Sequence, residues 1–192
     1  MPHPMAMPAT IRRWTKKRVL ALPPAYGTRF EVVAGELLVT PMPTPWHQIV
    51  HQRLSFAISD YLQPLGLRET MRNTAADISW TKDDLVQPDI FVVAPEDLSL
   101  DWKTYKHLRL VVEVLSWPSS RRADCGPKRR LYQAHGVETY WIVDPDTSEV
   151  EVWHPGDAEG ASVTDTLTWR VTPAAPELRI PLDEIFRAIA VK

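Results

Sequence analysis

The segment that most constrains the fold is residues 108–115, which place a carboxylate inside a near-continuous apolar run. Its sequence is Leu-Arg-Leu-Val-Val-Glu-Val-Leu, and a shorter apolar run lies upstream at residues 90–93. Near-continuous apolar runs of this kind are typical of central strands that are covered on both faces. We therefore predict a central sheet that carries Glu113 in its interior.

Two acidic residues stand where a buried sheet favours apolar ones. Glu113 lies within the longer run, and Asp89 follows Pro88 at the start of the shorter one. Burial penalises an ionised carboxylate, so a metal ion or another cation is expected nearby. Carboxylates at the ends of adjacent strands suit Mg²⁺, which binds oxygen ligands and substrate phosphates. The alternative for Glu113 is a salt bridge or a strand edge that faces water.

Lys128 is the candidate third group of this site. It belongs to a predicted helix over residues 124–135, and it shares a helical face with Tyr132 four residues later. A lysine beside a metal orients or deprotonates the attacking water and stabilises charge that develops in the transition state. The alternative is a surface lysine near the helix N-terminus.

The other predicted elements follow from cap and turn residues. Thr15 predicts the N-cap of a short helix, Ala34-Gly35 a hairpin turn, and Thr44-Pro45 the start of a long amphipathic helix through residue 62. Further strands are predicted at residues 30–33, 36–39, 67–71, 77–80, 139–143 and 150–153. The predicted class is α/β with α+β character, in which a mixed central sheet is flanked by helices.

Length and composition favour one domain. At 192 residues the chain can bury one core, and we expect a disordered segment at residues 1–10 followed by a single domain at residues 11–192. No apolar run approaches the ~20 residues of a membrane span, and the first residues lack the apolar stretch of a signal peptide. The one cysteine, Cys125, cannot form an internal disulfide. We expect a cytoplasmic protein with no membrane partner.

The charges of the chain give mixed evidence on whether it binds nucleic acid. The net charge of −2 and the pI near 6.3 lie below those of dedicated nucleic-acid binders. A local basic cluster nevertheless comprises Arg121, Arg122, Lys128, Arg129 and Arg130. The four arginines of this cluster are candidate ligands for the DNA backbone. The alternative is a solvated helix face.

The order of the motifs along the chain can be compared with that of known protein families. In sequence order they are Phe30-Glu31, Gly35-Glu36-Leu37, His47, Pro88-Asp89, Glu113-Val114-Leu115-Ser116, Asp124, Lys128, Tyr132 and the segment 136–145. This order resembles the Uma-two family of bacterial restriction endonucleases, over residues 15–155. The resemblance implies a PD-(D/E)XK, restriction-endonuclease-like core, with metal held by the motif acids.

The resemblance also implies roles for individual residues. Asp89 and Glu113 are the implied ligands of Mg²⁺ or Mn²⁺, with the Val114 carbonyl as a further ligand. The parent superfamily places its lysine two residues after the acid, where this chain has Leu115. Lys128 on the neighbouring helix is the expected substitute.

Two further residues are candidate supports of the site, each with a structural alternative. Glu36 would add a carboxylate or else face solvent from its strand, and His47 would contact a phosphate or else serve the helix structurally. The implied activity is hydrolysis of DNA phosphodiester bonds, with a homodimer as the form that cuts both strands. The alternative is a catalytically inactive nuclease fold that binds nucleic acid or a protein partner.

Overall fold

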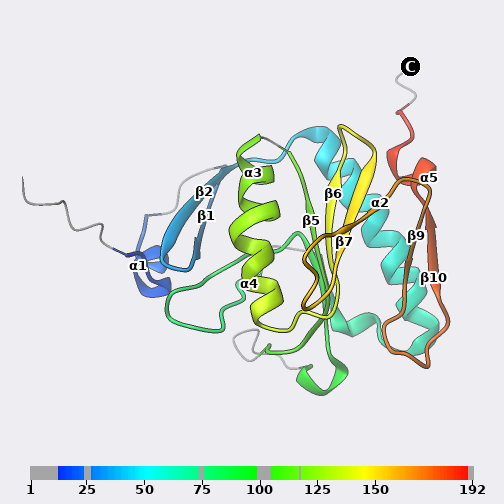
Figure 1. The fold of residues 1–192 in the computed structure, drawn as a ribbon, viewed down its shortest axis with the longest axis horizontal. Helices are drawn as coiled ribbons and strands as arrows, with labels where there is room; N and C mark the ends of the chain where they lie inside the picture. The colour runs from blue at the N-terminus through cyan, green and yellow to red at the C-terminus, as the bar shows by residue number, and fades with distance from the viewer. Residues whose placement is uncertain (1–12, 24–26, 74–75, 99–104, 117, 190–192) are drawn as a thin grey trace, which may run out of the picture.

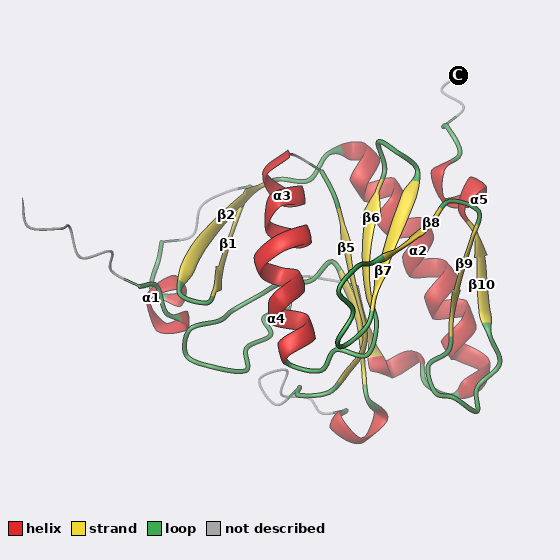
Figure 2. Cartoon of the chain, viewed as in Figure 1, coloured by secondary structure: helices red, strands yellow, loops and turns green. Residues whose placement is uncertain are grey.

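The structure is a computed structural model that describes residues 13–23, 27–73, 76–98, 105–116 and 118–189. A six-stranded sheet in the order β3-β4-β5-β6-β7-β8 forms its centre (Figures 1 and 2). Its strands are β3 (Met71–Arg72), β4 (Ile90–Val93), β5 (Leu108–Val114), β6 (Tyr140–Asp144), β7 (Glu149–Trp153) and β8 (Ala161–Val163). β5 and β6 run parallel and the other neighbours antiparallel, so the sheet is mixed, as predicted.

Helices cover both faces of this sheet. Figure 1 shows α2 (Pro45–Leu62) on one side and α3 (Pro118–Ala123) with α4 (Arg129–Ala134) on the other. In β4, Ile90 and Val92 pack toward α2, while Phe91 and Val93 belong to the cluster on the α4 side. All four side chains are fully buried, which confirms a strand covered on both faces.

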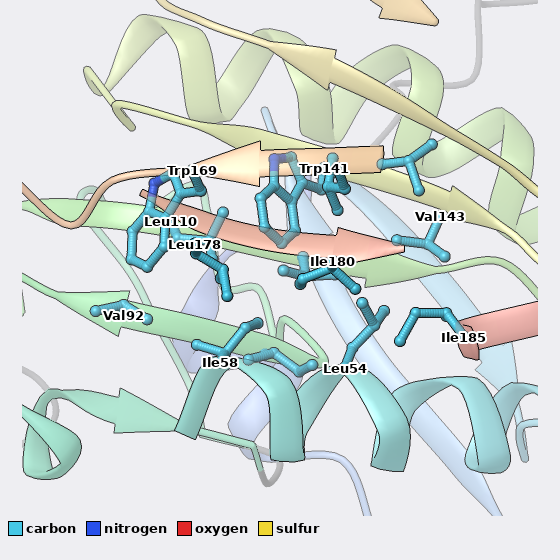
Figure 3. Close-up of a cluster of buried hydrophobic side chains, with 14 of the residues drawn as sticks. Leu54, Ile58, Val92, Leu110, Trp141, Val143, Trp169, Leu178, Ile180 and Ile185 are labelled. Carbon is cyan, nitrogen blue, oxygen red and sulfur yellow. The ribbon is translucent and has the colours of Figure 1, made fainter. Parts of the chain in front are cut away.

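The larger core lies between α2 and the sheet. Figure 3 shows Leu54 and Ile58 of α2 facing the strands, together with Trp141 of β6. The helix begins as predicted, because the Thr44 hydroxyl accepts a hydrogen bond from the His47 backbone N–H at 3.2 Å. This cap fixes the entry of α2 and therefore the position of its first turn.

Two hairpins flank the layers. The first, β1 (Thr28–Val33) with β2 (Glu36–Pro41), lies beyond α3 and α4 and follows the short helix α1 (Lys16–Leu20). Ala34 and Gly35 both have positive φ angles, of 51° and 82°, which suits a two-residue hairpin turn. The second hairpin lies beside α2 and comprises β9 (Thr166–Trp169) and β10 (Leu178–Pro181), followed by α5 (Leu182–Phe186).

Two predicted strands are largely wrong. At residues 67–71 a 3₁₀ turn, stabilised by the Thr70 hydroxyl donating to the Leu67 carbonyl at 2.6 Å, leaves β3 with two residues. At residues 77–80 a single bridge joins Ile78 to Val86. The Asp84 carboxylate accepts the Trp80 N–H at 2.7 Å, and this turn ends the extended segment.

Other features lie outside the prediction or outside the described residues. No element was expected after residue 153, where the structure has β8, β9, β10 and α5. The segment 1–10, expected to be disordered, lies outside the described residues. Among the residues that are described, no helix is long and apolar enough to span a membrane.

Candidate active site

Asp89, Glu113 and Lys128 line one small pocket of about 30 Å³. A cavity of this size holds one or two water-sized groups. The lining residues are Arg29, Glu31, Thr40, Pro41, Pro43, His47, Asp89, Glu113, Val114, Ser116, Ala123, Asp124 and Lys128. Four of them are acidic and are called the pocket carboxylates below: Glu31, Asp89, Glu113 and Asp124.

Strand register brings Asp89 and Glu113 together. β4 and β5 pair antiparallel with Ile90 opposite Val112, so one further step places Asp89 beside Glu113. The Val114 backbone N–H donates to Asp89 Oδ2 at 2.9 Å. Alternation along both strands directs the two side chains to the face covered by α3 and α4. The sequence prediction of a carboxylate pair at adjacent strands therefore matches the geometry.

An irregular helical turn directs Lys128 to the same place. Between α3 and α4 the chain forms a π-helical turn at Asp124–Lys128 with Pro127 inside it. Turns of this type inside α-helices often occur at functional sites. Here the turn leaves both Asp124 and Lys128 buried, at 3% exposure each. The predicted helix over residues 124–135 thus begins earlier, at Pro118, and changes its pitch over Asp124–Lys128.

Lys128 contacts three carboxylates. Its Nζ lies 3.0 Å from Glu31 Oε1, 3.0 Å from Glu113 Oε1 and 3.2 Å from Asp124 Oδ1. Burial by itself lowers the pKa of this ammonium, but the three facing carboxylates raise it well above its ordinary value. Lys128 is therefore protonated at neutral pH, and it donates hydrogen bonds rather than accepting a proton.

Glu31 and Asp124 were missed as site residues. Both are buried, and Glu31 also accepts the Gln87 backbone N–H at 2.8 Å. Glu31 stands in a hairpin strand that precedes Asp89 by nearly sixty positions, so no local periodicity connects the two. The available signal was a charged residue, Glu31, directly before the apolar Val32-Val33 pair.

Arg29 and His47 surround Asp89. The Arg29 guanidinium lies 3.3 Å from Asp89 Oδ1, and His47 Nε2 lies 3.7 Å from Asp89 Oδ2. His47 Nδ1 is 2.8 Å from the Ser116 hydroxyl. Burial lowers the pKa of His47, against an opposing effect of Asp89, and a hydrogen bond joins the imidazole to the Val114 backbone. The imidazole is therefore neutral near pH 7, and it engages the backbone group expected as a further metal ligand.

Tyr132 supports Glu113 from α4. Its hydroxyl donates to Glu113 Oε1 at 2.8 Å, the same oxygen that Lys128 contacts. Burial and the Glu113 charge raise the pKa of Tyr132 well above its ordinary value, so the phenol remains a donor. Leu115, at the position of the superfamily lysine, is buried in the apolar cluster on this face. Lys128, rather than a residue at position 115, therefore places an ammonium group beside Glu113 Oε1.

Comparison with known proteins assigns the chain to a family. The model of the Uma2 family, described as "Putative restriction endonuclease", matches residues 17–183, which is most of the chain. The chain belongs to the Uma2 family. This result confirms the motif resemblance, and a nuclease family implies a nucleic-acid substrate.

A solved structure supports the fold of this Uma2 chain. A crystal structure from Anabaena variabilis, described as "a putative nuclease belonging to DUF820", is similar with a TM-score of 0.72. The two chains share 20% sequence identity, and the match covers 90% of this chain and 97% of the other. At this identity the likeness establishes the nuclease-like fold alone. A search of curated proteins found no match.

The pocket of this Uma2 chain fits a divalent cation in charge and donor type. Restriction-endonuclease-like families generally use divalent metal ions. Among the described lining residues, the four pocket carboxylates, when all are ionised, exceed the cations Lys128 and Arg29 by two negative charges. Burial raises the pKa of Glu113 well above its ordinary value; Lys128 offsets part of this, while Asp124 adds to it. Because desolvation is the main cause of this shift, a cation bound in the pocket would favour the ionised form of Glu113.

The described residues offer few side-chain ligands for a metal ion. Within the described residues, no three His, Cys, Asp or Glu side chains are arranged as ligands of one metal ion. An ion held by Asp89 and Glu113 would therefore take most of its ligands from water or substrate oxygens, as Mg²⁺ commonly does. The donor set fits a magnesium-like ion better than zinc, which prefers several nitrogen or sulfur ligands.

The other predicted site residues of the Uma2 chain are dispersed. His47 lines the pocket, whereas Glu36 is exposed at the hairpin turn and lies outside the lining. The hairpin contributes Glu31 instead, because Glu31 is the buried acid of β1. Among the basic residues, Arg121 pairs with Asp144, and the Arg129 guanidinium lies 4.3 Å from the centroid of the Trp153 ring.

Arg122 and Arg130 are exposed. Contact of DNA with any of the four arginines stays a prediction.

Asp124 is expected to give the Uma2 chain a distinctive pH dependence. Burial raises the pKa of Asp124 from 3.8 to about 6, with Lys128 offsetting part of the effect. The folded chain keeps this proton at a pH where the unfolded chain has released it, so stability falls as pH rises from about 4 to 6. We expect Asp124→Asn to flatten that part of the stability curve, measured by urea unfolding with metal chelated.

The exposed Asp60 provides the matched control for this measurement. Asp60→Asn should leave the slope unchanged. An Asp124→Asn variant with the wild-type slope would show that the carboxyl ionises normally in the folded chain.

Proposed function

We propose that this Uma2 chain is an endonuclease that hydrolyses DNA phosphodiester bonds with Mg²⁺, or Mn²⁺ in its place. Asp89 and Glu113 would hold the ion, and Lys128 would act beside it. The observation that carries the proposal is the convergence of these three groups on one pocket with an excess of negative charge. The bound ion would supply Lewis-acid stabilisation of the scissile phosphate and of the leaving oxygen.

Side chains of the protein would carry out the steps that the ion does not. Lys128 is held in its protonated form by its three carboxylate neighbours, which engage its three N–H donors, so its proposed role is to position Glu113 for the ion. It does not deprotonate the water. His47 is neutral and lines the same pocket, so it is the side chain that we propose accepts the proton. Tyr132 holds Glu113 in place through its hydroxyl.

A plasmid-cleavage assay tests this function. The wild-type chain with Mg²⁺ is expected to nick or linearise plasmid DNA, and Asp89→Asn to lower the rate at least about 100-fold, beyond the loss typical of groups that merely orient metal ligands. Glu36→Gln is the matched control, because Glu36 is exposed and lies outside the pocket. It should cleave like wild type.

Two outcomes would reject an endonuclease. The first is no Mg²⁺-dependent cleavage, and the second is equal cleavage by wild type and Asp89→Asn. Salt-sensitive DNA binding without turnover would support the inactive, nucleic-acid-binding alternative.

We further propose that residues 11–192 act as one domain in the cytoplasm. Cleavage of both strands of a duplex is easier with two such pockets, which a homodimer with closed symmetry would supply.

A further inference from the structure

A second hollow lies beside α2, close to the end of β3. It encloses about 370 Å³, within the range of small-ligand sites. Its lining comprises Gln48, Ile49, His51, Gln52, Ser55, Phe56 and Asn73. None of the catalytic groups proposed above belongs to it.

The lining has the chemistry of a base-binding surface. No Lys, Arg, Asp or Glu occurs among the described residues that line it, whereas Gln48, Gln52 and Asn73 supply amide donors and acceptors. Amides of this kind recognise base edges, while basic groups provide most contacts with phosphates. The hollow therefore favours a nucleobase over a phosphate group.

Phe56 provides a stacking platform in the same hollow. Its side chain is 61% exposed, and it follows Gln48 and Gln52 at intervals of four residues, so the three share one face of α2. Exposed aromatic rings beside hydrogen-bonding side chains are the usual partners of unpaired bases.

The hollow adjoins the catalytic pocket. His51 lines the hollow, and its Nε2 lies 3.1 Å from the backbone oxygen of Asp89, whose carboxylate faces the pocket. His47, which lines the pocket, directly precedes Gln48, which lines the hollow, so the two sites are neighbours at the start of α2. A nucleic-acid strand bound at the mouth of the pocket can therefore place a base in the hollow.

We propose that this hollow is a nucleobase subsite, in which one unpaired base of the substrate strand stacks on Phe56 and hydrogen-bonds to Gln48 and Gln52. The inference rests on the proposed function for the identity of the ligand as nucleic acid. It predicts a preference for substrates that present an unpaired base, or a base extruded from a duplex, since a base inside an intact duplex has its faces and its pairing edge already engaged.

Fluorescence anisotropy with a labelled single-stranded DNA oligonucleotide, and with its duplex, tests the subsite. The full chain is titrated in EDTA, so the result does not depend on cleavage. Phe56→Ala is expected to lower affinity for the single strand about tenfold and to change duplex affinity far less. Phe56→Tyr, which keeps a ring, should bind nearly as wild type does.

A strand carrying 2-aminopurine adds a readout that simple destabilisation does not mimic. Its fluorescence should be quenched on binding to wild type and less so on binding to Phe56→Ala. Leu20→Ala removes a side chain that is 59% exposed elsewhere, and Gln63→Ala removes an exposed amide of the adjoining turn. Both controls should bind the single strand as wild type does.

The experiments can reject the subsite and the nuclease activity independently of each other. Unchanged single-strand affinity in Phe56→Ala, an equal loss for the duplex, or no binding of the single strand would overturn the subsite. A chain that binds as expected but does not cleave would reject the nuclease and keep the subsite.

Discussion

Replacing Lys128 by methionine should destabilise the folded chain by about 3–5 kcal/mol, the range for removing one partner of a buried ion pair. Lys128 and the three carboxylates that it contacts are each 3% exposed or less. Without the ammonium these carboxylates lose their shared counter-charge in a site that water hardly reaches. Urea unfolding at pH 7 with metal chelated measures the loss.

An exposed lysine serves as the control that separates loss of the buried ion pair from loss of any positive charge. Lys17 is exposed, and Lys17→Met should change stability by at most about 0.5 kcal/mol. Addition of Mg²⁺ should restore part of the stability of Lys128→Met, because a bound divalent ion replaces the lost positive charge. Equal, small changes in both variants would mean that Lys128 does not hold the pocket carboxylates together.

Replacing Glu113 by glutamine should lower the cleavage rate about 1000-fold, toward the upper range for removing one preorganised electrostatic group. Folding stability should stay within about 1 kcal/mol of wild type or rise. Burial raises the pKa of Glu113 well above its ordinary value, so the folded chain gains little from its ionised form. The amide keeps an oxygen that accepts from Lys128 and Tyr132. Plasmid cleavage and urea unfolding, measured on the same preparation, give the two quantities.

A large loss of activity without a loss of stability makes the prediction specific. Glu159 is an exposed acid in the loop before β8, and Glu159→Gln should preserve both activity and stability. Wild-type cleavage by Glu113→Gln would exclude Glu113 as an essential metal ligand. A joint loss of activity and stability would assign it a structural role.

Much of the site follows from local patterns. The apolar runs of β4 and β5 predicted two central strands, and their alternation directs Asp89 and Glu113 to one face. The Thr44-Pro45 cap predicted the start of α2, which positions His47. These features depend on residues a few positions apart, so periodicity and capping are enough to indicate them.

Other features depend on contacts between distant segments. Residues 67–71 had the composition of a strand, but most of the segment folds as a 3₁₀ turn. The C-terminal hairpin β9–β10 consists of two four-residue strands, which carry too little alternation to be recognised alone. Leu178 and Ile180 gain their burial by packing into the core beside α2.

The sequence by itself determined the acid pair, the helix that carries Lys128 and the covered sheet, because each is encoded by neighbours along the chain. Tertiary structure alone decided that Glu31 rather than Glu36 enters the pocket, and that Lys128 contacts three carboxylates at once. Charge interactions act through space between segments whose sequence separation carries no period. The charge balance of the pocket, on which the proposed chemistry depends, is therefore a property of the fold.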